Sequence, residues 1–314
     1  MQHRRSWAGL GLALLAWSAG TGANDLVAQQ QWLNSPLPTS GRPIFPFFEG
    51  WYDNGDGTFT LSFGYLNRNP NDIVEIPHGD RNYIEPAEFN GQQPTTFSPS
   101  RNRGVFAVTI PASMRDEDIW WYITDDDGTV YKVPGRTRSS GYQLDWVPRP
   151  HGSLPPLLWF TSEQDAFRGP EGSFAPTSLT ASVGRPVTLS VSARDLSQRD
   201  PQDPRFREPV AVTVTWSKYQ GPPGGVTFTR HDSNPVPPPA AGGRGQVGGR
   251  GQAAPRPEVI RLAGGQGTAQ VIATFPAPGD YIMRAQADNF DSPDSTPGDQ
   301  CCWTNAYVRV SVAP

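Results

Sequence analysis

The residues best suited to chemistry are Cys301 and Cys302, the only two cysteines, which are adjacent and precede Trp303. In an oxidising compartment they can form a disulfide with each other. Adjacent Cα atoms lie about 3.8 Å apart, below the usual disulfide spacing of about 4.4–6.8 Å, so this bridge would be strained and easily reduced. The sequence favours a local disulfide that constrains the chain at the start of the last strand and contacts no ligand. A ligand-contacting surface shared with Trp303 and free or intermolecular thiols are the alternatives, and a zinc site is disfavoured because no histidine is near.

A second candidate is the aromatic run from Ile119 to Ile123, which reads IWWYI. Side chains of a strand alternate between its two faces, so if Trp121 and the isoleucines face a core, Trp120 and Tyr122 face the other way. Aromatic rings stack on sugar rings, and carbohydrate binding through Trp120 and Tyr122, joined by Trp51, is one hypothesis. The favoured alternative is that a second sheet and a neighbouring domain or loop cover both faces.

Metal chemistry is suggested only by a loop with four aspartates, Asp288, Asp291, Asp294 and Asp299. Calcium binds several oxygen ligands from such loops. The spacing does not match an EF-hand, and the spacing of Asp53–Gly57 does not match one either. A solvated acidic loop is therefore favoured, and the sequence predicts no cofactor, with calcium as the disfavoured alternative.

Catalytic motifs are mostly missing from the sequence. There is no H-E-x-x-H, no G-x-S-x-G and no P-loop, and the histidines after the first residues are far apart. A glycosidase needs two carboxylates at a set separation, which the sequence cannot show. A secreted hydrolase is therefore the least favoured functional hypothesis. The carboxylates that could form such a pair with an aspartate are Glu75, Glu85 and Glu88. The histidines after the first residues are His78, His151 and His231.

The first residues predict export. Arg4 and Arg5 precede an apolar stretch, Trp7–Trp17, that is too short for a membrane anchor and is followed by small residues. We expect a signal peptide over 1–23, then a tail over 24–43, and a destination in the periplasm, on the cell surface or outside the cell. The formal net charge of −4 gives no support for nucleic-acid binding, and no later segment is long and apolar enough to cross a membrane.

The elements that must position these residues are strands. Gly 33 and Pro 34 are too frequent for long helices. A first β-sandwich domain is expected over 44–165, because Thr58–Tyr65 alternates strictly after the hairpin turn Asp53–Gly57. A second turn is expected at Asp125–Gly128 and an irregular excursion over 72–97. The further strands are expected at Phe47–Tyr52, Val105–Ile110, Ile119–Thr124, Thr129–Val133 and Tyr142–Val147.

The second domain is expected over 173–314. Its strands show five apolar stripes with a period of two, which two packed sheets would bury. A Gly/Pro/Arg-rich stretch, about 229–257, cannot bury enough apolar surface to fold and is expected to be a flexible insertion. The stripes contain Val187–Ala193, Val210–Trp216, Ala269–Phe275, Tyr281–Ala287 and Ala306–Val312.

This second half resembles the PKD/REJ-type immunoglobulin-like domains of extracellular proteins, over about residues 175–313 without the insertion. The runs that carry the resemblance are Val212–Phe228, Gly267–Asn289 and Tyr307–Val312. It implies an immunoglobulin-like sandwich that serves adhesion, spacing or binding. Trp216 would supply a large core side chain, and Tyr281 stands where a tyrosine corner would tie the strand to nearby backbone.

The sequence thus predicts an all-β protein of two antiparallel β-sandwich domains, the second immunoglobulin-like. The predicted function is that of an exported, non-catalytic structural or binding protein of bacterial type. Its partner would be a protein or a glycan on or near the cell surface, and neither nucleic acid nor a membrane-spanning segment of the mature chain is expected. Carbohydrate binding through an exposed aromatic surface is the alternative function.

Overall fold

The structure, a computed structural model, describes residues 41–146, 153–200, 202, 210–235, 256–289 and 303–314. These residues belong to one compact unit, Thr39–Pro314. The predicted signal peptide, the predicted tail up to residue 40, Cys301 and Cys302, His151 and most of the predicted insertion lie outside the described residues. So do the aspartates of the acidic loop after Asp288. The described part contains no helix long and apolar enough to cross a membrane.

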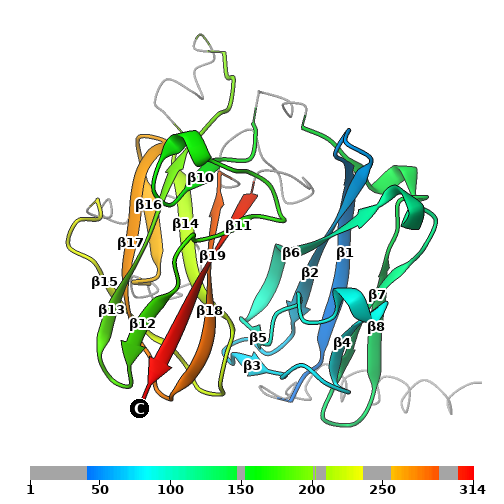
Figure 1. The fold of residues 1–314 in the computed structure, drawn as a ribbon, viewed down its shortest axis with the longest axis horizontal. Helices are drawn as coiled ribbons and strands as arrows, with labels where there is room; N and C mark the ends of the chain where they lie inside the picture. Colours follow the sequence, from blue (N-terminus) through cyan, green and yellow to red (C-terminus); the bar gives the residue numbers. More distant parts are fainter. Residues whose placement is uncertain (1–40, 147–152, 201, 203–209, 236–255, 290–302) are drawn as a thin grey trace, which may run out of the picture. The chain divides into compact units, whose positions relative to one another are not determined.

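Two sheets form the first sandwich (Figure 1). One has the order β6-β2-β1-β9, with β1 (Ile44–Asp53), β2 (Thr58–Asn67), β6 (Ser100–Pro111) and β9 (Gln143–Leu144). The other has the order β4-β7-β8, with β4 (Asn82–Glu85), β7 (Ile119–Thr124) and β8 (Val130–Gly135). All pairs are antiparallel except β1 with β9. A short pair, β3 (Val74–Glu75) with β5 (Thr96–Phe97), lies beside them.

Aromatic rings fill the space between these two sheets. Phe63 of β2 stacks on Phe106 of β6 with centroids 5.1 Å apart, and the edge of Trp121 of β7 meets Phe106 at 4.9 Å. Trp121 has no exposed surface. The predicted core face of β2 is confirmed, because Phe59, Leu61 and Phe63 all belong to this core. The strand is not half-buried, however, because Thr60 and Ser62 on its other face are also buried.

The hairpin between β1 and β2 forms as predicted. Asp53 Oδ1 accepts a hydrogen bond from Gly55 N at 2.9 Å, and Asp56 Oδ1 accepts one from Thr58 N at 2.9 Å. Gly55 and Gly57 have φ values of 75° and 89°, which a side chain would oppose. The acidic residues of this turn therefore organise the backbone.

Two predictions for the first half are corrected. The excursion 72–97 is not wholly irregular, because it contains β3, β4, β5 and a 3-10 turn at Ala87–Phe89. Its anchor is Asn82, which has no exposed surface, donates to Ile76 O at 2.9 Å and to Pro94 O at 2.7 Å, and accepts from Trp121 Nε1 at 3.1 Å. Among the described residues, the strand predicted over Tyr142–Val147 is reduced to β9, which forms a two-residue parallel pairing with β1.

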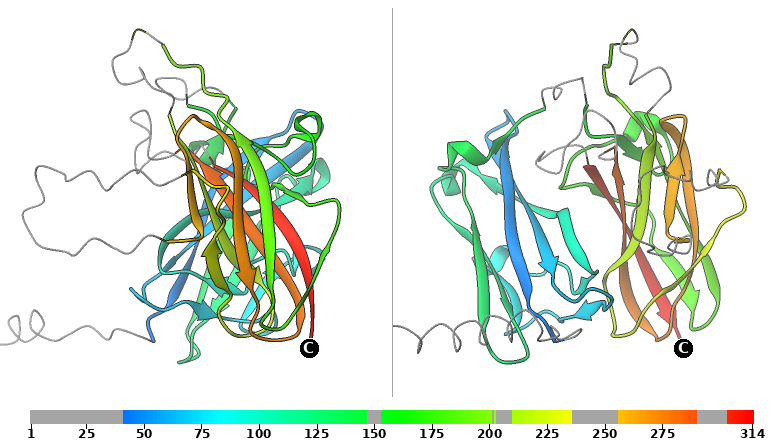
Figure 2. Two further views of the ribbon diagram at one scale, coloured as in Figure 1. Left: turned by 90° about the vertical axis from the view of Figure 1, so that its left-hand side faces the viewer. Right: turned by 180° about the vertical axis from the view of Figure 1, so that it is seen from behind.

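The second sandwich also has two sheets (Figure 2). The first sheet has the order β10-β13-β17-β15, and the second has the order β11-β19-β18-β14-β16, with β12 paired to β19. Neighbouring strands are antiparallel except β11 and β12, which both run parallel to the last strand, and this gives the immunoglobulin-like arrangement. The bounds are β10 (Leu157–Trp159), β11 (Ser173–Phe174), β12 (Leu179–Ser182), β13 (Pro186–Arg194), β14 (Val212–Gln220), β15 (Thr227–Arg230), β16 (Val259–Leu262), β17 (Gln266–Thr274), β18 (Gly279–Asp288) and β19 (Trp303–Ala313).

The five predicted stripes meet in one core between these sheets. Trp216 is 1% exposed within it, as predicted. Tyr281 Oη donates a hydrogen bond to Ala277 O at 2.9 Å, which confirms the predicted tyrosine corner at the entry to β18. At about 25 cal/mol per Å² of buried apolar surface, such inner faces supply most of the stabilisation of the fold.

The two sandwiches share contacts along β6, the edge strand of its sheet. Three consecutive residues of β6 present backbone carbonyls to the outer face of β18 and β19. Arg284 Nη1 donates to Val105 O at 2.8 Å, and Asn305 Nδ2 donates to Gly104 O at 2.7 Å. Gln286 Nε2 donates to Arg103 O at 2.9 Å. An open sheet edge is a row of unpaired polar groups, and side chains of the second sandwich satisfy this one.

Candidate functional site: an outer aromatic face

The predicted alternation of β7 is present. Ile119, Trp121 and Ile123 have no exposed surface. Trp120 and Tyr122 are half-buried on the opposite face of the strand. Because Trp121 fills the core, the other two rings are available for a different role.

Strand pairing places further side chains beside these rings. Tyr83 of β4 and Lys132 of β8 are the register partners of Tyr122 on either side. Tyr83 stacks on Tyr122 with centroids 4.5 Å apart and planes 7° from parallel, and Trp120 lies 6.3 Å from Tyr122 at 38°. We call Tyr83, Trp120, Tyr122 and Lys132 the outer aromatic face. Cross-strand pairs of this kind stabilise a sheet while leaving ring surface accessible.

A cation and a carboxylate complete this surface. The Lys132 ammonium lies 4.6 Å from the centroid of Trp120 and 5.3 Å from that of Tyr122, within the range of a cation–π interaction. Burial raises the pKa of the Tyr122 phenol, and its hydrogen bond with Glu85 raises that pKa further. The phenol therefore stays protonated at neutral pH. The face offers flat apolar rings, hydroxyl groups and one positive charge.

Two of the other predicted site residues are buried, which corrects their assignment. Trp51 is 4% exposed, and its Nε1 donates to Ser139 O at 3.0 Å within the first sandwich. Trp303 is also 4% exposed and packs on Gly104, where an added Cβ would overlap its indole. Neither ring is available to a ligand, because each is covered by a segment distant in sequence. Cys301 and Cys302 lie outside the described residues.

Sequence reasoning missed Tyr83 and Lys132. Tyr83 lies in the segment taken as irregular, where no alternation marks a strand. Lys132 lies in a strand that was predicted, and continuing the alternation from Val133 would have placed it on the outer face.

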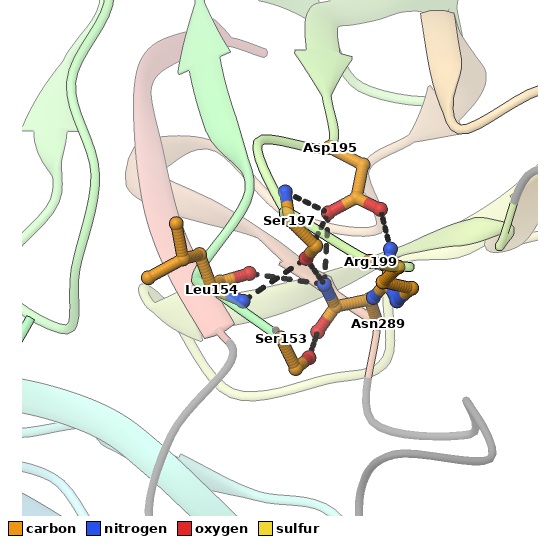
Figure 3. Close-up of polar contacts among 6 residues, drawn as sticks. All are labelled: Ser153, Leu154, Asp195, Ser197, Arg199 and Asn289. Atoms are coloured by element: carbon orange, nitrogen blue, oxygen red, sulfur yellow. Dashed lines mark hydrogen bonds and ion pairs between the residues drawn. The ribbon is translucent and has the colours of Figure 1, made fainter. Parts of the chain in front are cut away.

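A partly buried polar cluster lies where β13 and β18 end (Figure 3). Asn289 Nδ2 donates to Leu154 O at 2.9 Å, to Asp195 Oδ1 at 3.0 Å and to Ser197 Oγ at 3.1 Å. Ser197 Oγ donates to Asp195 Oδ1 at 2.6 Å, and Arg199 pairs with the other carboxylate oxygen. The cluster holds a serine beside an aspartate, but Arg199 and Asn289 already engage the Asp195 carboxylate. Ser197 Oγ in turn accepts hydrogen bonds from Leu154 N and Asn289 Nδ2. We interpret the cluster as a structural tie between three segments.

The other groups considered for catalysis have separate partners. His78 Nε2 contacts Gln93 O at 2.9 Å, and His231 Nδ1 contacts Ser233 Oγ at 2.8 Å. Glu75 pairs with Lys218, whereas Glu85 forms a hydrogen bond with Tyr122 of the outer aromatic face. Within the described ranges, no group of three or more His, Cys, Asp or Glu could hold a metal ion.

Comparisons with known proteins do not identify a family. No family model matches the chain, and no curated protein matches it. Among solved structures, the D00-D0 domain of intimin matches at 10% identity over 85% of this chain and 99% of its own, with a TM-score of 0.23. Domains 4 and 5 of the S-layer protein SbsC match at 11% identity over 87% and 98%, with a TM-score of 0.23.

A third solved structure, the Yersinia pseudotuberculosis adhesin InvE, matches at 12% identity over 87% of this chain and 60% of its own, with a TM-score of 0.21. By their titles, the second match is a surface-layer protein and the third is an adhesin. At these TM-scores the likeness carries no argument, and the immunoglobulin-like assignment of the second sandwich rests on its own strand order. The resemblance to PKD/REJ-type domains stays a prediction.

Proposed function

We propose that the chain is an exported, non-catalytic binding protein that recognises carbohydrate through its outer aromatic face. It would act in the periplasm, on the cell surface or outside the cell, consistent with the leader expected over 1–23. In this proposal the first sandwich carries the specificity. The immunoglobulin-like second sandwich serves as a spacer or interaction module, and the partner is a glycan on or near the cell surface.

The observation that carries the proposal is the arrangement of three rings, Tyr83, Trp120 and Tyr122, on one sheet face. None of them is needed to fill the core. Tyr and Trp combine an apolar body with a polar tip, and a sugar ring likewise combines an apolar C–H face with hydroxyl groups. Lys132 and Glu85 at the margin supply a donor and an acceptor for those hydroxyls.

A glycan array tests the proposal with the processed chain and two variants. Trp120→Ala removes the largest ring of the face. Tyr142→Ala is the matched control, because Tyr142 is an aromatic ring that is 52% exposed and lies elsewhere on the first sandwich. We expect the wild type and the control to bind the same glycans and Trp120→Ala to lose about tenfold or more in affinity, the scale of a binding hot spot. Absence of any glycan signal, or an unchanged signal for Trp120→Ala, would contradict carbohydrate binding.

The non-catalytic part of the proposal has its own test. The purified chain is incubated with a panel of glycoside, ester and peptide substrates, with and without a metal chelator. We expect no turnover above buffer. Turnover that co-purifies with the chain and disappears in a variant of Glu75, Glu85 or Glu88 would show a hydrolase instead.

A further inference from the structure

An open groove of about 820 Å³ lies where β5 and β6 of the first sandwich meet β14 and β18 of the second. Its volume is within the range of small-molecule sites, about 300–1,000 Å³. Its walls combine polar with apolar side chains, and hydroxyl and amide side chains dominate the part built from β6, β14 and β18. These side chains are Ser100, Asn102, Thr215, Ser217 and Gln286, and Ser98 lines the groove just before β6.

Most of the cations that line the groove are neutralised by carboxylates. Arg101 pairs with Glu49 at 2.8 Å, Arg256 pairs with Glu258 at 2.7 Å, and Lys218 pairs with Glu75. Pairing of this kind is expected, because a charge removed from water is costly unless an opposite charge or hydrogen bonds compensate it. These pairs leave the remaining cation, Arg284, as the exception.

Arg284 lines the groove, is 7% exposed and forms no ion pair with any carboxylate in the described part of the chain. Its Nη1 donates to Val105 O, but its buried Nε has no hydrogen-bond partner among the described residues. Burial raises the pKa of three phenols, those of Tyr65, Tyr219 and Tyr307. The positive charge of Arg284 lowers each of these pKa values, but by less than burial raises it. They therefore stay neutral and do not balance the guanidinium.

Two further features of the groove are typical of ligand sites. Thr96 lines it, and its buried Oγ1 has no hydrogen-bond partner among the described residues. Ser100 lines it with a φ of 72°, which is unfavourable for a residue with a side chain. Strained backbone conformations persist only where the surrounding structure holds them, and they occur most often at ligand and active sites.

We propose that this groove binds a sugar acid, with the ligand carboxylate paired to Arg284. A planar guanidinium matches a carboxylate in geometry and charge. The groove has a single unbalanced cation, which suits a monoanion better than a phosphate dianion. The surrounding hydroxyl and amide groups suit a ligand that carries several hydroxyls. The proposal does not rest on the outer aromatic face, which belongs to a different sheet.

Calorimetric titration of the full chain with sodium glucuronate tests the proposal, with glucose, sodium phosphate and sodium sulfate as comparison ligands. We expect saturable binding of glucuronate, and binding of the other three at least about tenfold weaker, the scale of one charge-assisted contact. Absence of glucuronate binding, or phosphate or sulfate binding of equal strength, would overturn the proposal.

Removing Arg284 would also remove its bond to Val105, so the decisive variant leaves it in place. Ser217 is the register partner of Arg284 on β14 and lines the same groove. Ser217→Glu supplies an internal carboxylate beside the guanidinium, and Ser217→Gln adds the same bulk without the charge.

We expect Ser217→Glu to lose glucuronate binding and to melt at a higher temperature than Ser217→Gln, which should retain at least part of the binding. If Ser217→Glu binds glucuronate as tightly as Ser217→Gln, Arg284 is not the anion site and the proposal is wrong. This result is separate from the glycan array, because Trp120→Ala should leave glucuronate binding in the groove unchanged.

Discussion

Asn305 of β19 donates a 2.7 Å hydrogen bond from its Nδ2 to the backbone carbonyl of Gly104 on β6. The same Nδ2 donates to Pro170 O at 2.7 Å, and the Oδ1 accepts from Gln286 Nε2 at 3.3 Å. Asn305 has no exposed surface. One side chain thus satisfies the edge of the first sandwich and a loop of the second.

Asn305→Ala should therefore destabilise the chain strongly. It leaves the carbonyls of Gly104 and Pro170 buried without this donor, and an unsatisfied buried polar group costs about 1–3 kcal/mol. We expect a loss of about 2–4 kcal/mol in the free energy of unfolding, measured by urea denaturation. Asn71→Ala, at an exposed asparagine, is the control and should change little. Equal stability of the two variants would show that the contact contributes nothing.

Gly104→Ala tests the same contact from the other side. Gly104 has a φ of 51°, and an added Cβ would overlap the indole of Trp303. Gly128→Ala is the matched control, because Gly128 has a φ of 82° with open space around its Cβ position. Both variants carry the backbone cost of about 1 kcal/mol, but only Gly104→Ala must also move Trp303. We expect a clearly lower melting temperature and a red-shifted tryptophan emission for Gly104→Ala alone, and equal melting temperatures would contradict the packing.

The sequence predicts only part of this contact. The inner stripe of β19, Ala306, Val308 and Val310, is apolar, and the sequence predicts it because two sheets must bury it. The outer positions Trp303 and Asn305 look like an ordinary solvent face. Their burial depends on β6, about 200 residues earlier in the chain, and local periodicity carries no information about such a partner.

The same limit explains the mixed result for the aromatic residues. Trp120 and Trp121 differ only by the parity of their position, and alternation separates them correctly once Ile119 is placed in the core. Trp51 has no such neighbour to fix its side. Asn82 and Tyr83 belong to a strand that is held by the long-range hydrogen bonds of Asn82. Because this strand has no alternating apolar pattern, the sequence does not predict it. The groove at Arg284 was not predicted, because an unbalanced buried charge can be recognised only when its surroundings are known.

The ionisation of Glu49 should make the free energy of unfolding depend on pH. Its carboxylate is 2% exposed, and burial raises its pKa above the ordinary value, although the opposite charge of Arg101 partly offsets this. The folded state thus holds the proton more tightly than the unfolded chain. The stability that this protonation contributes is fully present below the ordinary pKa of 4.5 and is lost as pH rises through the raised pKa of the folded state.

We therefore expect the wild type to lose stability relative to Glu49→Gln as pH increases. Urea denaturation of both proteins at about pH 4 and about pH 7 measures this difference, from which titrations common to both cancel. Glu88→Gln, at an exposed residue, is the control and should show no such trend. A difference between wild type and Glu49→Gln that stays constant or reverses with pH would contradict the assigned shift.

Asn82 links the core of the first sandwich to the outer aromatic face. It bonds Trp121 in the core and the carbonyls of Ile76 and Pro94, while the next residue, Tyr83, stacks on Tyr122. Asn82→Ala should loosen β4 and withdraw Tyr83 from the face. We expect a loss of about 2–4 kcal/mol in stability and, at temperatures where the variant remains folded, weaker glycan binding than in the wild type. Tyr83→Ala removes the ring alone, so it should weaken glycan binding with little change in stability. If Tyr83→Ala binds glycans like the wild type while Trp120→Ala does not, Tyr83 supports the sheet and takes no part in recognition.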